Sequence, residues 1–146
     1  MLVKLGPPDR KNKAETIVIH DYDTWNVDVT LAYIIVPMLK RLKEVKHGAP
    51  FVDNEDVSDE LRASDEDLHT HSKNGETDEH YFDRWDYVMD EMIFAFESKL
   101  EDWDEQFFSG GHSLNGKFNK EGYEKYSERI NNGFKLFGKY YNGLWD

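Results

Sequence analysis

Residues 23–47 read DTWNVDVTLAYIIVPMLKRLKEVKH, and the spacing of the apolar residues in this stretch decides the fold class. These residues recur at intervals of three and four, which is the period of one face of an α-helix. They are Val27, Leu31, Ile34, Ile35, Met38, Leu42 and Val45. Asp23 and Thr24 are suitable N-cap residues, and the basic residues that follow suit the negative end of the helix dipole. The pattern predicts a helix over 23–47, kinked by Pro37.

The rest of the chain adds two helical patterns, a short strand pair and a long acidic connection. Brief β-branched runs on either side of a proline-containing turn predict a hairpin, and Asn119 is a suitable cap for the last helix. The sequence therefore predicts a mainly α fold with a small N-terminal β-hairpin (α+β), a three-helix core and a single compact domain, 1–146. Its segments are the hairpin 1–22, helix 23–47, acidic connection 48–78, helix 79–108 and helix 118–142.

The length and composition exclude several classes of protein. A chain of 146 residues can enclose one core without disulfides or metals. No apolar run reaches the roughly 18 residues that a membrane-spanning helix needs, and residues 1–8 lack the apolar centre of a secretory signal. The absence of cysteine excludes disulfide scaffolds, thiolate zinc sites and thiol nucleophiles. We therefore expect a cytoplasmic protein with no membrane partner.

The formal net charge of −12 is concentrated in the middle of the chain. Residues 53–105 contain 20 acidic and 4 basic residues, a net of −16, whereas the flanking segments contain 14 basic and 10 acidic residues. Binding to phosphates needs Lys and Arg side chains that displace counterions, so we expect no duplex nucleic acid as partner. Two interpretations remain. The charge keeps the protein dispersed, or an acidic face imitates nucleic acid and docks on a basic partner.

Enzyme signatures in the sequence are weak. The pairs Asp83-x-x-Asp86 and Glu101-x-x-Asp104 loosely resemble the paired acids of all-helical, magnesium-dependent nucleotide pyrophosphatases. On one helix these pairs lie roughly 27 Å apart, too far to share ions without a break in the helix or a dimer. The Gly-rich turn after Ser109 lacks a P-loop, a dinucleotide motif and a nucleophile elbow. We predict no catalytic residue, no metal ligand and no cofactor.

Aromatic residues make up 14% of the chain, and several of them lie near predicted helix ends. One interpretation is packing in the core and at interfaces. The other is a pocket in which rings stack a base while cations, and N–H groups at a helix start, meet phosphate. Its predicted ligand-binding residues are Thr24, Trp25, Lys46, His47, Arg84, Trp85 and Tyr87. In this hypothesis Trp25 and Trp85 stack the ligand, and a second helix or subunit completes the pocket.

Two groups of short motifs resemble those of small proteins from tailed bacteriophages. The first group contains DTW at 23–25, TLA at 30–32 and KHGAP at 46–50, and the second contains RWDY at 84–87, DEMI at 90–93 and AFE at 95–97. The resemblance covers about residues 16–100 and brings no chemistry with it. It implies that the protein acts in the cytoplasm of an infected bacterial host.

In that context the residues favour a non-catalytic binding protein that sequesters a nucleotide signal of bacterial immunity, such as a cyclic oligonucleotide. The alternative is an acidic inhibitor, or nucleic-acid mimic, that binds a basic surface of a host protein. Further alternatives are a virion or replication accessory protein and a metal-dependent nucleotide hydrolase. The open edge of the hairpin and the broad apolar face of helix 79–108 also predict a homo-oligomer.

Overall fold

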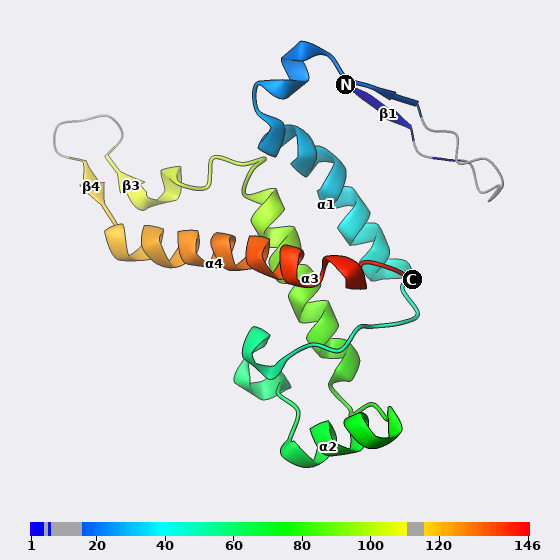
Figure 1. Ribbon diagram of the computed structural model, residues 1–146. Helices are drawn as coiled ribbons and strands as arrows, with labels where there is room; N and C mark the ends of the chain where they lie inside the picture. Colours follow the sequence, from blue (N-terminus) through cyan, green and yellow to red (C-terminus); the bar gives the residue numbers. More distant parts are fainter. Residues whose placement is uncertain (5, 7–15, 111–115) are drawn as a thin grey trace.

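The computed structural model describes residues 1–4, 6, 16–110 and 116–146, and it confirms the mainly α fold with a small N-terminal hairpin (Figure 1). Within these residues the α-helices are α1 (Val27–Val45), α2 (Asp65–Asn74), α3 (Tyr81–Glu97) and α4 (Lys120–Lys139). The antiparallel strand pairs are β1 (Leu2–Lys4) with β2 (Thr16–Val18), and β3 (Phe108–Ser109) with β4 (Lys117–Phe118). The predicted turns within 7–15 and 111–115 lie outside the described residues. No helix in the described part of the chain combines the length and the apolar character needed to cross a bilayer.

Helix α3 lies at the centre of the core and contacts both α1 and α4. Its side chains Trp85, Met89 and Met92 are fully shielded from solvent. Gly133 of α4 lies so close to α3 that a methyl group there would overlap the Glu91 carbonyl. Burying each large side chain contributes roughly 1.5–3 kcal/mol to the free energy of folding. The predicted three-helix core is therefore built by α1, α3 and α4, while α2 buries no residue.

The first helix begins later than predicted and turns a different face to the core. A 3₁₀ turn, Asp21–Thr24, precedes α1, so the helix begins at Val27, and it continues through Pro37. The buried residues of α1 are Ala32, Val36 and Leu39. At about 100° per residue, they lie roughly 120° around the helix from the predicted apolar face. Met38 of the predicted face stays 54% exposed, because α3 packs against the other face.

The predicted helix 79–108 is wrong at its C-terminal end, because α3 stops at Glu97. The helix ends there in a turn, in which the Ser98 hydroxyl donates a hydrogen bond to the Ala95 carbonyl at 2.7 Å. Trp103 then leaves the direction of the helix and stacks on Tyr126 of α4, with ring centroids 5.1 Å apart. Packing against α4 therefore replaces the last turns of the predicted helix, because stacked aromatic side chains bury large apolar surfaces.

The acidic connection 48–78, for which the sequence predicts no helix, contains regular structure. It holds two 3₁₀ turns, Asn54–Asp56 and Asp59–Leu61, and the unpredicted helix α2. The Ser64 hydroxyl accepts a hydrogen bond from the Asp67 N–H (3.1 Å), and the Asp67 carboxylate accepts one from the Ser64 N–H (3.2 Å). This reciprocal capping box is the signal in the sequence that identifies α2. Apolar periodicity does not reveal the helix, because it buries no residue.

Candidate functional site

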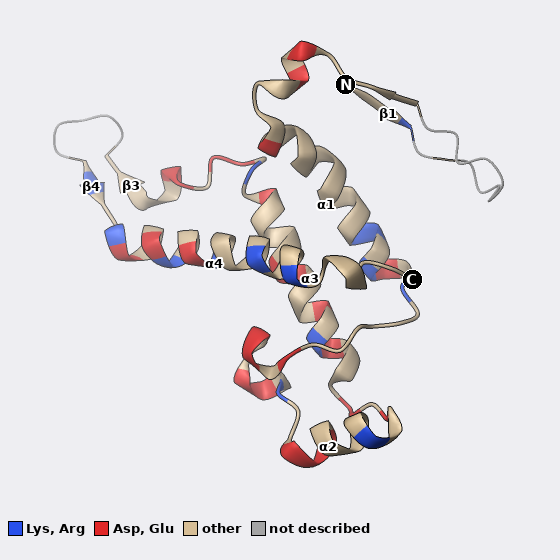
Figure 2. Cartoon of the chain, viewed as in Figure 1, with Lys and Arg blue, Asp and Glu red and all other residues tan. Residues whose placement is uncertain are grey.

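Three lysines of α1 pair with three acidic residues of α3, and we call this set the lysine ladder. The pairs are Lys40–Glu97 (2.5 Å), Lys43–Asp90 (2.6 Å) and Lys46–Asp86 (2.5 Å). Their order is reversed along the two helices, because α1 and α3 run antiparallel (Figure 2). The ladder thus neutralises Asp86, Asp90 and Glu97, which we call the acidic stripe of α3. The ladder also pairs Lys46, which the sequence predicts to contact the phosphate of a ligand, with Asp86.

The seven predicted ligand-binding residues lie in separate places. Thr24 and Trp25 precede α1, where the Thr24 hydroxyl donates to the Asp21 carbonyl at 2.7 Å and Trp25 is 76% exposed. Lys46 and His47 lie at the far end of this helix of 19 residues, roughly 28 Å away at about 1.5 Å per residue. The two ends of α1 therefore do not share a pocket for a small ligand.

The other three predicted residues lie on α3. Trp85 is buried in the core, where its ring meets the Tyr140 ring edge-on with centroids 5.9 Å apart. A ligand could stack on Trp85 only after the core had opened. Tyr87 is half-buried, and burial raises the pKa of its hydroxyl. Of the two predicted stacking residues, Trp25 is the one that presents an open ring.

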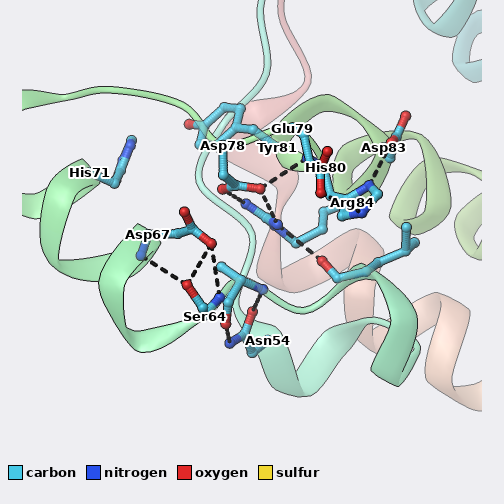
Figure 3. Close-up of polar contacts among 12 residues, drawn as sticks. Asn54, Ser64, Asp67, His71, Asp78, Glu79, His80, Tyr81, Asp83 and Arg84 are labelled. Atoms are coloured by element: carbon cyan, nitrogen blue, oxygen red, sulfur yellow. Dashed lines mark hydrogen bonds and ion pairs between the residues drawn. The ribbon is translucent and has the colours of Figure 1, made fainter.

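Arg84 is an anchor between elements, and its charge is not available to a ligand (Figure 3). Its guanidinium contacts both oxygens of Asp78, at 2.9 and 2.5 Å, and donates to the Leu61 carbonyl at 3.0 Å. Arg84 is 1% exposed. The hydrogen bonds from Arg84 hold the pKa of the Asp78 carboxyl below its ordinary value. Arg84 thus ties the turn Asp59–Leu61 and the start of α3 together.

Residues 53–83 form a second acidic region, which we call the acidic lobe. It contains 12 acidic and 2 basic residues, and Figure 2 shows acidic residues on α2 and on the turns before it. Several exposed carboxylates of the lobe have no Lys or Arg partner among the described residues. They are Glu60, Asp65, Glu66, Glu76, Glu79 and Asp83, and the last two contact the ring of His80. Asp65 and Glu66 lie in the first turn of α2, where their charge also suits the helix dipole.

A small hollow of about 170 Å³ opens on the acidic lobe. Its lining residues are Glu66, Asp67, Thr70, Glu76, Thr77 and Asp78. Carboxylates and hydroxyls accept hydrogen bonds, and carboxylates form their strongest hydrogen bonds with ammonium and guanidinium groups. The hollow is therefore chemically suited to a Lys or Arg side chain of a partner.

A further group of carboxylates on the lobe already holds a cation of the chain. Asp53, Glu55 and Asp56 place oxygen atoms within 4.8 Å of one another, a spacing that a metal ion could use. The Lys139 ammonium lies 2.8, 3.2 and 2.5 Å from these three residues, respectively. Hydrogen bonds to the carboxylates raise the pKa of Lys139, and burial raises the pKa of Tyr140 beside it to about 12. The cluster fastens the lobe to α4.

Exposed aromatic residues surround a hollow at the start of α1, which we call the aromatic hollow. Its volume is about 490 Å³, and its aromatic lining residues are Tyr22, Trp25 and Tyr33. The rings of Tyr22 and Trp25 lie 5.0 Å apart. Asp23 also lines the hollow, and a hydrogen bond from the His20 N–H lowers its pKa. The sequence analysis missed Tyr33, because Trp25 precedes α1 and no helical spacing relates the two residues.

The structure separates the two acidic pairs on which the nucleotide hydrolase alternative depends. Asp86 pairs with Lys46, Asp83 contacts the His80 ring at 3.1 Å, and α3 ends before Glu101. In the described residues these pairs do not form a group spaced for a metal ion.

Comparisons with protein-family models, with curated proteins and with solved structures found no match. The function is therefore inferred from the residues of this chain.

Proposed function

We propose that this chain is a non-catalytic binding protein whose acidic lobe docks on a basic surface of another protein. The observation that carries the proposal is a contrast in pairing. Three carboxylates of α3 are paired with the lysine ladder and a fourth, Glu91, with Arg129, whereas Glu60, Asp65, Glu66 and Glu76 have no Lys or Arg partner among the described residues. Glu60 lies in the turn Asp59–Leu61 and Asp65 and Glu66 lie in α2, so these three charges form a fixed pattern, and Glu76 follows the end of α2. Such a pattern complements a basic surface and steers its approach.

The chemistry of the lobe indicates the kind of surface that it fits. Proteins bind nucleic-acid phosphates with clusters of Lys and Arg, and the lobe carries the same sign of charge as those phosphates. Its hollow lined by Glu66, Asp67 and Glu76 suits an ammonium or guanidinium group. We therefore propose a nucleic-acid-binding protein of an infected bacterial host as the partner, in the host cytoplasm, in keeping with the resemblance to bacteriophage proteins.

A titration with a fluorescent oligolysine peptide tests whether the lobe, rather than any group of unpaired carboxylates, binds cations. The lobe variant is E60Q/D65N/E66Q/E76Q, and the control variant, E101Q/D102N/D104N/E105Q, removes the same charge from four exposed carboxylates outside the lobe that also lack a Lys or Arg partner among the described residues. Exposed ion pairs contribute about 0.2–1 kcal/mol each, so the lobe variant should bind about tenfold more weakly. The control should change binding less than threefold, and a similar loss in both variants would contradict the proposal.

A competition experiment tests the biological form of the proposal. A purified DNA-binding protein of the host is loaded on labelled duplex DNA, and the chain is added in increasing amounts. The intact chain and the control variant should release the DNA at the same concentration, whereas the lobe variant should require about tenfold more. Release that is equal for all three proteins would show that the lobe is not the docking surface.

The aromatic hollow supports a second candidate, the capture of a nucleotide immune signal. Trp25 is 76% exposed and lies beside Tyr22, so a base could stack on it without opening the core. Asp23 lines this hollow and its carboxylate repels phosphates, which favours a ligand with few phosphate groups.

Incubation with a panel of cyclic oligonucleotides, followed by heating, tests this second candidate. Intact ligand recovered from the chain supports sequestration, and a chemically altered ligand would indicate an enzyme. Trp25→Ala should lose capture, while Trp145→Ala, which removes another exposed tryptophan, should keep it. Equal capture by both variants would place the ligand elsewhere.

A further inference from the structure

The aromatic hollow is built from two parts of the chain that meet at the start of α1. The 3₁₀ turn that precedes the helix, with the residue after it, provides the rings of Tyr22 and Trp25. Helix α1 provides one face of its first two turns, because Asn26, Thr30 and Tyr33 follow one another at intervals of four and three residues. The volume of the hollow, about 490 Å³, lies within the range of about 300–1,000 Å³ for sites that bind small molecules.

The three rings of the hollow are open to a flat ligand. Trp25, Tyr22 and Tyr33 are 76%, 73% and 62% exposed. The rings of Tyr22 and Trp25 lie against each other, with centroids 5.0 Å apart, so a ligand cannot enter between them. A flat ligand therefore stacks on the open face of Trp25.

Asn26 offers the hollow a polar group that the fold does not use. It is the N-cap residue of α1, a position at which an Asn side chain ordinarily accepts a hydrogen bond from a helix N–H. Here the side chain makes no cap hydrogen bond, and the residue is exposed. Its amide presents a carbonyl oxygen and an NH₂ group side by side, which matches an adjacent donor and acceptor at the edge of a nucleobase. Asn26 is thus available to pair with a base that stacks on Trp25.

The charges around the hollow favour a ligand without phosphate. None of the described residues that line it is Lys or Arg. The Asp23 carboxylate lies 3.1 Å from the Met1 ammonium and accepts a hydrogen bond from the His20 N–H at 2.9 Å, so this ammonium is already engaged. The Thr30 hydroxyl donates to the Asp23 carbonyl at 2.9 Å. A phosphate in the hollow would lie near the carboxylate with no free cation to offset the repulsion.

We infer that the aromatic hollow binds an uncharged nucleoside, with its base stacked on Trp25 and the edge of the base paired with the Asn26 amide. The inference rests on the second candidate function above and narrows its ligand from a nucleotide to a nucleoside. Trp25 is the stacking residue, and Asn26 is the residue that determines specificity. The start of α1 and helix α2 of the acidic lobe lie at opposite ends of the molecule (Figure 1), so docking of the lobe does not depend on this site.

Calorimetric titration with adenosine, AMP and a cyclic dinucleotide of adenosine tests the class of ligand. Adenosine should bind about threefold more tightly than AMP, because the phosphate of AMP lies near Asp23. Trp25→Ala should weaken adenosine binding about fivefold or more, whereas Trp145→Ala, which removes another exposed tryptophan, should leave it unchanged. Binding of the cyclic dinucleotide without binding of adenosine would overturn the inference and leave the second candidate standing. Binding of none of the three ligands would overturn both.

Purine riboside, which lacks the amino group of adenosine, tests the role of Asn26. The intact chain should bind adenosine about fivefold more tightly than purine riboside, because either edge of adenine pairs with an amide through that amino group. This preference should disappear in Asn26→Ala. The control Asn142→Ala, at an exposed position of the 3₁₀ turn Tyr141–Gly143, should keep it.

Circular dichroism shows whether the variants are folded. Asn26→Ala should keep the fold and the thermal midpoint of the intact chain, because its side chain makes no cap hydrogen bond. A preference for adenosine that persists in a folded Asn26→Ala protein, or equal binding of adenosine by Trp25→Ala and the intact chain, would overturn the inference.

Discussion

The acidic stripe of α3 and the acidic lobe have the same kind of composition and opposite electrostatic surroundings. The stripe is neutralised by lysines of α1 that lie far away in the sequence, as in the Lys43–Asp90 pair at 2.6 Å. The lobe is held to the body by two cations, Arg84 of α3 and Lys139 of α4, which engage its inner carboxylates. Its outer carboxylates stay exposed. Net charge thus identifies both regions as acidic, but pairing decides which one presents negative charge to a partner.

Removing Arg84 should have the largest effect, because it breaks the inner anchor of the lobe. Arg84→Met leaves the Asp78 carboxylate buried without its partner, and breaking such a pair costs about 3–5 kcal/mol of the free energy of unfolding. Urea denaturation measures this loss. The control is Arg62→Met, which removes an exposed pair with Asp59 and should cost less than about 1 kcal/mol. Equally small losses in both variants would show that the lobe does not depend on this anchor.

Alkaline pH should weaken the second anchor through Tyr140. Its pKa is about 12 in the folded chain and 10.0 in the reference state, so folding favours the neutral hydroxyl. This stabilisation is complete below pH 10 and is lost as the pH rises from 10 toward 12, and it amounts to roughly 3 kcal/mol. The difference in free energy of unfolding between the intact chain and Tyr140→Phe should therefore shrink over that interval. The same comparison with the exposed Tyr141→Phe should show no such trend, and a trend of equal size there would remove Tyr140 as the cause.

Replacing Lys139 should turn the carboxylate cluster into a cation site. Lys139→Gln leaves Asp53, Glu55 and Asp56 facing one another and should cost about 1–2 kcal/mol, a modest loss because the lysine side chain is 37% exposed. Calcium prefers several carboxylate oxygens, so millimolar calcium should raise the thermal midpoint of this variant. The intact chain and the Lys120→Gln control should not respond. A shift of the same size in all three proteins would contradict this account of the cluster.

Replacing lysines of the lysine ladder should have the smallest effect on the free energy of unfolding. It tests most directly whether pairing explains the difference between the α3 stripe and the acidic lobe. Lys43→Gln removes an exposed pair and should cost less than about 1 kcal/mol. The triple variant K40Q/K43Q/K46Q leaves the α3 stripe without its lysines, so it should bind oligolysine about threefold more tightly than the intact chain. Unchanged binding by the triple variant would show that pairing does not explain the contrast between the two regions.

The sequence by itself determined the local elements of this protein. Helical periodicity identified α1 and α4, and the predicted cap at Asn119 is confirmed, since its side chain accepts a hydrogen bond from the Gly122 N–H at 3.0 Å. The capping box at Ser64 and Asp67 shows that α2 also carried a readable signal. These features could be predicted because backbone propensity and capping act between residues only a few positions apart.

Only the tertiary structure decided which surfaces those elements present. It placed Ala32 and Leu39 in the core in place of Leu31 and Met38, ended α3 where Trp103 could stack on α4, and buried Trp85 and Arg84 away from any ligand. The candidate site therefore moved from the predicted residues to the acidic lobe, with Trp25 alone of the predicted stacking pair still open. The physical reason is that burial and ion pairing depend on partners far away in the sequence. A pattern along one helix records that a face is apolar or acidic, but it does not record which face a second helix will cover.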